Sequence, residues 1–194
     1  MFGRPKITAL YKNIGSNVKF GKNVVISGLK GEPLRYLRIG SNCVFHDNVE
    51  IRISSSCDIG RGNVFHNNVH MVGGDTLDIG NNNWVGERTF LDSTGGLKID
   101  HGCTIGLNCQ IWSHVIRPSS TYMPGEDPTP QINMKQSTHI ASGVWLQGGN
   151  TQVSPGVTIA RNTVIIANAV VSKDTERGKV YGGIPIREVK IKGV

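Results

Sequence analysis

Aliphatic or phenylalanine side chains recur at intervals of six residues along most of this chain, and no other feature of the sequence constrains the fold as strongly. An α-helix repeats every 3.6 residues and a strand every 2, so a period of six requires a regular turn between short segments. Fifteen apolar residues follow this period: Ile14 and Phe20; Ile39 and Phe45; Ile59 and Phe65; Ile79 and Val85; Ile99 and Ile105; Ile140 and Leu146; Val153, Ile159 and Ile165.

A residue that tolerates positive φ stands three positions after each of these apolar residues. Fourteen of the fifteen followers are Asn or Gly, which enter the left-handed backbone region at the lowest cost, and the exception is Arg88. The followers are Asn17, Asn23, Asn42, Asn48, Gly62, Asn68, Asn82, Arg88, Gly102, Asn108, Gly143, Gly149, Gly156, Asn162 and Asn168. The repeat therefore predicts a coil with three short flat sides, whose apolar row points inward.

A second period of 20 residues lies on top of the first, as the positions of Ile39, Ile59, Ile79 and Ile99 show. Twenty residues are three six-residue sides plus two extra residues, and the extra residues always follow the third side. We expect them to stack at one corner of a prism, from which the longest excursion, about residues 117–138, also leaves. The count of units predicts about seven coils, each pairing its backbone with the next one ~4.8 Å away.

The composition excludes several other classes of protein. Charged residues make up only 18% of the chain and Gly contributes 25 of its 194 residues, which is unlike a helical bundle. The four cysteines form no CxxC pair or zinc-binding spacing, and no export signal follows the basic N-terminus. The longest apolar stretch, 164–171, is too short to span a bilayer. We therefore expect a cytoplasmic protein without membrane insertion, and its net charge of +7 favours an anionic partner.

Four segments in the C-terminal part of the chain carry a more specific likeness. They read Gly143-Val144-Trp145-Leu146, Pro155-Gly156-Val157-Thr158-Ile159, Val170-Val171-Ser172-Lys173-Asp174 and Gly182-Gly183-Ile184-Pro185-Ile186-Arg187. Together with the repeat, this series resembles the hexapeptide-repeat acyltransferases, in the branch of the sugar, galactoside and maltose O-acetyltransferases. The resemblance implies an all-β fold, a single-stranded left-handed parallel β-helix. It also implies a homotrimer with active sites between neighbouring subunits.

The domain organisation follows from where the repeat begins and ends. We expect an N-terminal lead-in at residues 1–13 and the β-helix acyltransferase domain at 14–175, with its protruding loop at about 117–138. A short C-terminal extension occupies residues 176–194. The resemblance implies that the domain transfers an acetyl group from acetyl-CoA, as a co-substrate, directly to a hydroxyl of a glycan, a polysaccharide precursor or an oligosaccharide. No acyl-enzyme, metal ion or nucleic acid partner is expected.

His114 is the candidate general base. Acyl transfer to a hydroxyl needs a base with a pKa near neutrality, and His114 stands where the excursion begins, at a position that resembles the family's catalytic base. The alternative is a corner histidine that only binds a loop carbonyl. Asp92, one coil earlier at the same corner, resembles the acidic residue that contacts the acceptor. Its carboxylate would hold a sugar hydroxyl or steady the imidazolium, or else simply form a turn.

Trp145 and two turn amides are the candidate donor-binding groups. Trp145 stands outside the aliphatic row, and the resemblance places a Trp here in the acyl-donor site; packing between subunits is the alternative. The amides near Gly148 and Ala167 match positions that hold the thioester and pantetheine in the family. Leu146 and Val153 are seven residues apart rather than six, which predicts a bulge at Gly148–Asn150.

Basic residues near the C-terminus are candidate ligands for the phosphates of coenzyme A. Residues 171–194 contain six Lys or Arg against three Asp or Glu. Arg187 and Lys190 match family positions that meet the nucleotide phosphates, where a cation is chemically suited, and Lys173 lies in the same segment. The alternative is an ordinary solvated basic tail.

Other functions remain open on these residues. An N-acetyltransferase acting on an amino sugar or a nucleotide-sugar would use the same base. A zinc enzyme like the γ-class carbonic anhydrases would need three histidine ligands, whereas the spacing of His46 and His66 predicts a surface ladder in which one stacks on the other, with His70 nearby. A β-helix scaffold without catalytic activity is the remaining alternative.

Overall fold

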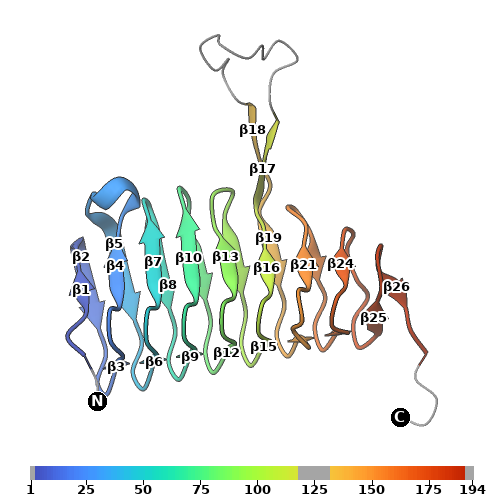
Figure 1. The fold of residues 1–194 in the computed structure, drawn as a ribbon, viewed down its shortest axis with the longest axis horizontal. Coiled ribbons are helices and arrows are strands. Elements are labelled where there is room, and N and C mark those ends of the chain that lie inside the picture. The colour runs from blue at the N-terminus through green and yellow to red at the C-terminus, as the bar shows by residue number, and fades with distance from the viewer. Residues whose placement is uncertain (1–2, 118–131, 191–194) are drawn as a thin grey trace.

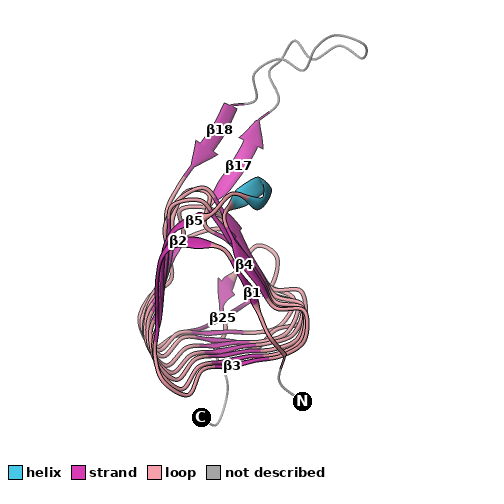
Figure 2. Cartoon of the chain, turned by 90° about the vertical axis from the view of Figure 1, so that its left-hand side faces the viewer, coloured by secondary structure: helices cyan, strands magenta, loops and turns pink. Residues whose placement is uncertain are grey.

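The chain folds into a left-handed parallel β-helix with a triangular cross-section (Figure 1 and Figure 2). The computed structural model describes residues 3–117 and 132–190. Short strands stack into three flat sheets, which we call sheets A, B and C, and each sheet forms one side of the prism. Every complete coil passes through sheet B, then sheet C, then sheet A. A single short 3-10 helix, η1 (Leu29–Gly31), interrupts the strands of the described residues.

Each sheet receives one strand from every coil that crosses it. Sheet A contains β1 (Lys6–Ile7), β4 (Val25–Ser27), β7 (Glu50–Ile53), β10 (His70–Gly73), β13 (Phe90–Asp92), β16 (Gln110–Ile111), β21 (Gln152–Val153) and β24 (Val170–Val171). Sheet B contains β2 (Ala9–Ile14), β5 (Leu34–Ile39), β8 (Ser56–Ile59), β11 (Leu77–Ile79), β14 (Leu97–Ile99), β19 (Thr138–Ile140) and β22 (Thr158–Ile159). Sheet C contains β3 (Lys19–Phe20), β6 (Val44–Phe45), β9 (Val64–Phe65), β12 (Trp84–Val85), β15 (Thr104–Ile105), β20 (Trp145–Leu146), β23 (Val164–Ile165), β25 (Val180–Gly182) and β26 (Arg187–Glu188).

The stacking register confirms the period of 20. Ile39 pairs with Ile59, Ile59 with Ile79, and Ile79 with Ile99 on successive parallel strands of sheet B. Sheet B holds seven strands, so the prism contains seven complete coils, as predicted from the repeat. The pairing is parallel throughout the three sheets except at the C-terminal end, where β26 runs antiparallel to β25.

The predicted apolar row fills the interior of the prism. Thirteen of its fifteen members are buried, and the exceptions are Ile14 and Phe20. These two residues belong to the first complete coil, which no complete coil covers on its N-terminal side. Phe20, Phe45 and Phe65 stack along the axis with ring centroids 5.2 and 4.9 Å apart. The core is therefore a column that each coil extends by one layer.

The predicted turn positions all have the predicted backbone conformation. Every one of the fifteen followers, including Arg88, has a positive φ. Their side chains also stack, and the amide of Asn17 donates to Asn42 at 2.8 Å while that of Asn23 donates to Asn48 at 3.0 Å. The extra residue predicted as a bulge at Gly148–Asn150 instead lengthens the turn between β20 and β21, where three consecutive residues have positive φ, and the two strands pair in regular register.

The extra residues of each coil collect at the corner between sheets A and B, and the excursion leaves from that corner (Figure 2). It starts and ends as an antiparallel hairpin of β17 (His114–Arg117) and β18 (Ile132–Lys135). Residues 118–131 of the predicted loop lie outside the described residues.

Both ends of the chain add strands to the prism. The segment expected as a lead-in, 1–13, contains β1 and most of β2, which pair with β4 and β5. The segment expected as an extension, 176–194, contains β25, which continues sheet C. None of the described segments forms a helix long and apolar enough to cross a membrane.

Candidate active site

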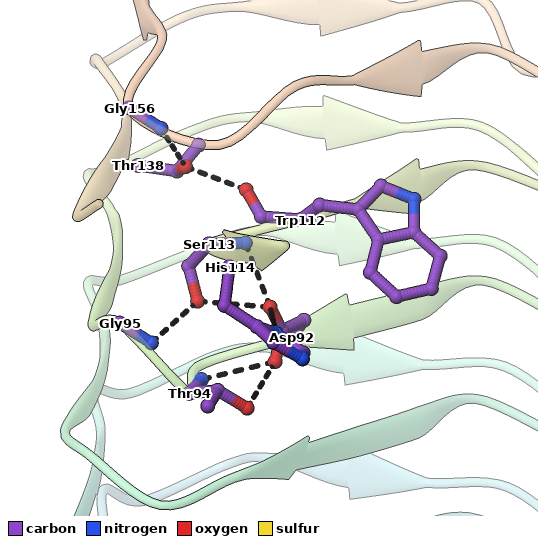
Figure 3. Close-up of polar contacts among 8 residues, drawn as sticks. All are labelled: Asp92, Thr94, Gly95, Trp112, Ser113, His114, Thr138 and Gly156. Atoms are coloured by element: carbon purple, nitrogen blue, oxygen red, sulfur yellow. Dashed lines mark hydrogen bonds and ion pairs between the residues drawn. The ribbon is translucent and has the colours of Figure 1, made fainter. Parts of the chain in front are cut away.

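The fold brings His114 and Asp92 into direct contact at the corner between sheets A and B (Figure 3). Asp92 ends β13, and His114 begins β17 one coil further on, where the chain leaves the prism. The Nδ1 atom of His114 lies 2.7 Å from Oδ2 of Asp92. The stacking of coils therefore converts a separation of 22 residues in sequence into a hydrogen bond.

The carboxylate of Asp92 is buried and accepts hydrogen bonds from three residues. The backbone N–H and the hydroxyl of Thr94 donate to Oδ1 at 3.0 and 2.6 Å. The backbone N–H and the hydroxyl of Ser113 donate to Oδ2 at 2.7 and 3.0 Å, beside the bond from His114. Burial by itself would raise the pKa of Asp92, but the hydrogen bonds from Thr94, His114 and Ser113 outweigh burial and lower the pKa. Asp92 is therefore ionised at neutral pH.

The ionised carboxylate fixes the imidazole tautomer of His114. A carboxylate only accepts hydrogen bonds, so Nδ1 of His114 must carry the proton of the 2.7 Å contact. In the neutral ring, Nε2 then holds a lone pair, and it makes no hydrogen bond to any residue that the structure describes. The side chain of His114 is 17% exposed, so a ligand at the surface can approach the ring.

An open pocket of about 400 Å³ adjoins His114 on the side facing the C-terminal coils. It lies over sheet A and the hairpin, and its walls are Trp112, His114, Val115, Gln152, Val153, Ser154 and Pro155. The walls are mostly apolar, with the imidazole and a few polar groups among them. Such a pocket suits a slender ligand that carries one reactive group.

Aromatic rings line the sheet beside His114. Trp112 lies with its ring centroid 6.4 Å from that of His114 and 5.0 Å from that of Phe90 on the preceding coil. The carbonyl of Trp112 accepts a bond of 2.6 Å from the buried hydroxyl of Thr138, which in turn accepts one from the N–H of Gly156 (Figure 3). These bonds join three successive coils, so the backbone next to His114 is held on both sides.

The structure does not bring Trp145 to His114 within one chain. Trp145 stands on the outside of sheet C, where its side chain is 48% exposed, as expected from its place outside the apolar row. Sheet C is the side of the prism opposite the corner that carries His114 (Figure 2). Trp145 is also absent from the walls of the pocket.

Gly148 and Ala167 lie at a different corner from His114. They belong to stacked turns between sheets C and A, and a Cβ atom added to the adjacent Gly149 would approach Ala167 to 3.1 Å. Within the described part of the chain, the N–H groups of Gly148 and Ala167 have no hydrogen-bond acceptor. Gly148 is buried, whereas Ala167 is partly exposed.

The predicted cationic residues lie near the C-terminal end of the prism. Lys173 follows β24, Arg187 belongs to β26 and Lys190 comes after it, and all three are exposed. They stand outside the walls of the pocket. Lys179 of the same region instead pairs with Glu176 at 2.9 Å and Glu188 at 3.0 Å.

The predicted histidine ladder is present on sheet C. His46 and His66 stack with centroids 4.8 Å apart, and His66 lies 4.5 Å from the ring of Trp84. Burial, and then the neighbouring His46, lower the pKa of His66. Among residues 3–117 and 132–190, no three His, Cys, Asp or Glu side chains gather as a metal site would require.

Sequence reasoning missed Thr94 and Ser113, the two residues that complete the shell of hydrogen bonds around Asp92. The signal was present in the sequence, since each hydroxyl residue lies within two positions of Asp92 or His114. Residues at the same corner of stacked coils meet, so polar residues next to a candidate acid are candidates for its partners.

Comparisons with known proteins agree with this fold. No protein-family model matches the chain. The galactoside O-acetyltransferase of Escherichia coli (strain K12) is 39% identical over 51 residues, which are 26% of this chain and 25% of that protein. The matched segment therefore spans about a quarter of the length of that relative.

Two solved structures share the fold at low sequence identity. A point mutant of AntD, an N-acyltransferase from Bacillus cereus in complex with dTDP and coenzyme A, has a TM-score of 0.61 at 17% identity and covers 94% of this chain and 83% of its own. The polysialic acid O-acetyltransferase OatWY has a TM-score of 0.53 at 22% identity, covering 93% and 88%. The predicted β-helix is thus confirmed, and so is the resemblance to hexapeptide-repeat acyltransferases.

Proposed function

We propose that this chain is an acyl-CoA-dependent acyltransferase that moves an acetyl group from acetyl-CoA to a hydroxyl of a sugar. The observation that carries the proposal is the bond of 2.7 Å between His114 and the buried Asp92 at the edge of an open pocket. In this pair Nδ1 of His114 is held in a hydrogen bond to the carboxylate, and Nε2 has no hydrogen-bond partner among residues 3–117 and 132–190. Direct acyl transfer to a hydroxyl needs such a base.

His114 would take the proton from the acceptor hydroxyl as the oxygen attacks the thioester carbonyl. The carbon–sulfur bond then breaks, and the imidazolium returns the proton to the departing sulfur. Asp92 would not exchange this proton, because its lowered pKa keeps it ionised, but it would stabilise the positive charge on His114. The step balances without a metal ion or a covalent enzyme intermediate.

The donor would lie along sheet A. Its thioester would occupy the pocket beside Trp112 and His114, where Ser154 and Pro155 form the other wall. The pantetheine arm would run toward the N–H groups of Gly148 and Ala167 at the next corner, which have no acceptor among the described residues. Lys173, Arg187 and Lys190 would meet the phosphates at the C-terminal end of the prism.

We also propose that the chain forms a homotrimer whose active sites lie between subunits. Within one copy, Trp145 faces away from His114 on the opposite side of the prism. A role for Trp145 in donor binding therefore requires the sheet C face of a second copy beside the pocket of the first.

Transfer to an amino group is the second candidate. His114 would serve as a base for an amine as well as for a hydroxyl. AntD, which shares the fold with a TM-score of 0.61, is an N-acyltransferase whose structure was solved with dTDP and coenzyme A. An amino sugar attached to a nucleotide is accordingly the competing acceptor.

The test is a thiol-release assay with acetyl-CoA and a panel of sugars, amino sugars and nucleotide-sugars. We expect acceptor-dependent release of free coenzyme A, and His114→Ala should lower the turnover ~10²–10⁴-fold while acetyl-CoA still binds. Treatment of the product with hydroxylamine distinguishes an ester from an amide. His139→Ala is a matched control, because His139 also pairs with a carboxylate, that of Asp100 at 3.0 Å, but on sheet B. Equal turnover of His114→Ala and the natural protein would remove His114 as the base.

A further inference from the structure

The outer face of sheet A carries two aligned rows of side chains on the N-terminal side of His114. Strand pairing places Glu50, His70 and Phe90 in the first row, one on each of three successive strands. The second row contains Arg52, Val72 and Asp92 in the same register. The intervening residues of these strands point into the core. The rows therefore form a continuous surface that ends at the pair of His114 and Asp92.

A polar cluster occupies the far end of this surface. The Nε atom of Arg52 donates to Oε1 of Glu50 at 2.6 Å, and Nδ1 of His70 lies 3.2 Å from Oε2 of the same carboxylate. Burial alone would raise the pKa of Glu50, but its bonds to Arg52 and His70 lower the pKa. The three side chains are 25 to 46% exposed. The cluster is thus ordered by its own contacts and still presents donors and acceptors to solvent.

Two aromatic side chains, Phe90 and Trp112, lie between this cluster and His114. Phe90 follows His70 in the first row, and its ring lies 5.0 Å from that of Trp112 with an angle of 44° between the planes. Both rings are half-buried on the outside of the sheet. Aromatic faces bordered by planar polar groups suit the C–H faces and hydroxyls of a sugar chain.

We propose that Glu50, Arg52, His70, Phe90 and Trp112, which we call the acceptor strip, bind a linear oligosaccharide that runs across the strands toward His114. This inference rests on the proposed function and specifies its acceptor. The sugar that receives the acetyl group lies against Phe90 and Trp112, and a following sugar exchanges hydrogen bonds with Glu50 and Arg52.

The spacing of the strands sets a minimum length for the acceptor. Arg52 and Asp92 stand two strands apart in register, and neighbouring strands are separated by ~4.8 Å, so Arg52 is about 10 Å from the position of Asp92, which contacts His114. One sugar ring does not fill this distance while its hydroxyl reaches His114. An acceptor of two or more linked sugars does.

The acceptor strip and the donor pocket share Trp112, beside His114, and have no other residue in common. The pocket uses Gln152, Ser154 and Pro155 on the C-terminal side, whereas the strip occupies the preceding coils. Both sites are able to hold their ligands at the same time, which direct transfer without an acyl-enzyme requires.

The test measures how the affinity of the whole protein chain for oligosaccharides depends on the number of linked sugars. Cello-, malto-, chito- and α2,8-linked sialic acid oligosaccharides of one to four residues are titrated by calorimetry without acetyl-CoA, and the same sugars are then offered in the thiol-release assay. For at least one series, we expect the affinity to rise about tenfold from the monosaccharide to the disaccharide. Arg52→Ala and Glu50→Gln should each remove this gain. Arg35→Ala is the matched control, an exposed arginine on β5 of sheet B.

Each outcome bears on the inference separately from the proposed function. No binding by any series, equal affinity for one and four residues, or a length effect that persists in Arg52→Ala would overturn the acceptor strip. Binding that depends on the strip without any thiol release would retain the strip and contradict the proposed transfer. Thermal melts of each variant establish that the prism remains folded.

Discussion

Asp92 illustrates at the scale of one residue how a carboxylate at a corner of the prism becomes part of a site. It lies at a corner, yet five hydrogen bonds from Thr94, Ser113 and His114 enclose it. The sequence left two functional roles open for this carboxylate, contact with an acceptor hydroxyl or support of the imidazolium. The geometry favours the second role, because both carboxylate oxygens already have partners within the chain.

Asp92→Asn should lower both activity and stability. The amide offers an N–H₂ group where His114 needs an acceptor, so the side chain at position 92 no longer fixes the proton on Nδ1 of the imidazole. We therefore expect kcat to fall ~10–10³-fold with little change in the KM for acetyl-CoA. Loss of the charged acceptor should also lower the free energy of unfolding at pH 7 by about 1–3 kcal/mol. Steady-state kinetics and urea denaturation measure the two effects.

The stability effect of Asp92→Asn should depend on pH in one direction. The pKa of Asp92 is lower in the folded than in the unfolded chain, so its stabilising contribution is fully present above the unfolded value of ~3.9 and is lost as the pH falls through the folded value. The difference between the natural protein and the variant should therefore shrink below about pH 4. The exposed Asp78 on β11 offers the control Asp78→Asn, and a pH-independent difference would contradict the explanation.

The residues of the site were predictable to different degrees. His114 and Asp92 could be placed at one corner, because the period of 20 aligns residues of successive coils. The partners Thr94 and Ser113 could not be identified from the period alone, since it does not say which hydroxyl turns inward. The separation of Trp145 from His114 follows from the face on which Trp145 lies, and this face becomes meaningful for function only when a second copy is considered.

At the scale of the elements, the turns between sheets C and A form a ladder of amide side chains that Arg88 interrupts. Asn23 donates to Asn48 at 3.0 Å and Asn48 to Asn68 at 3.2 Å. Arg88 follows in this column with φ of 56°, and its Nε atom donates to Asn108 at 3.0 Å. Arg88 has no side-chain oxygen to accept from the amide of Asn68.

Arg88→Asn should stabilise the protein. Asn tolerates the left-handed conformation better than Arg, and its amide would accept from Asn68 and donate to Asn108 as its neighbours in the column do. We expect an increase of about 0.5–1 kcal/mol in the free energy of unfolding, measured by chemical denaturation. The reverse change in the same column, Asn68→Arg, should lower it, and a stabilised Asn68→Arg would contradict the ladder as the cause.

The strands themselves were less predictable than the turns. Positive φ is a local cost that particular residues relieve, so all fifteen turns could be located from Asn, Gly and spacing. In contrast, most of β2 lies in the segment expected as a lead-in, because Leu10 and Tyr11 of this terminal strand are exposed and follow no six-residue pattern. A strand at the end of a solenoid pairs on one side only, so its burial pattern is incomplete.

At the scale of the whole molecule, the proposed trimer predicts a mass. Three chains of 21.0 kDa give about 63 kDa in sedimentation equilibrium.

If Trp145 completes a neighbouring site, Trp145→Ala should raise the KM for acetyl-CoA more than it lowers kcat, because it removes binding rather than the base. The exposed Trp84, on β12 of the same sheet and nearer the N-terminus, provides the comparison Trp84→Ala. A monomer of full activity would contradict the shared site.

The exact register of the 20-residue units has an implication for how such a molecule can change over generations. Duplication of one 20-residue unit in the gene would insert one coil into the prism, and every other side chain would stay on the same sheet. A duplication on the N-terminal side of Asp92 would lengthen the surface that leads to His114. The imidazole, its carboxylate partner and the neighbouring pocket would not change. The length of the ligand-binding surface can therefore change by one coil at a time, while the catalytic residues stay the same.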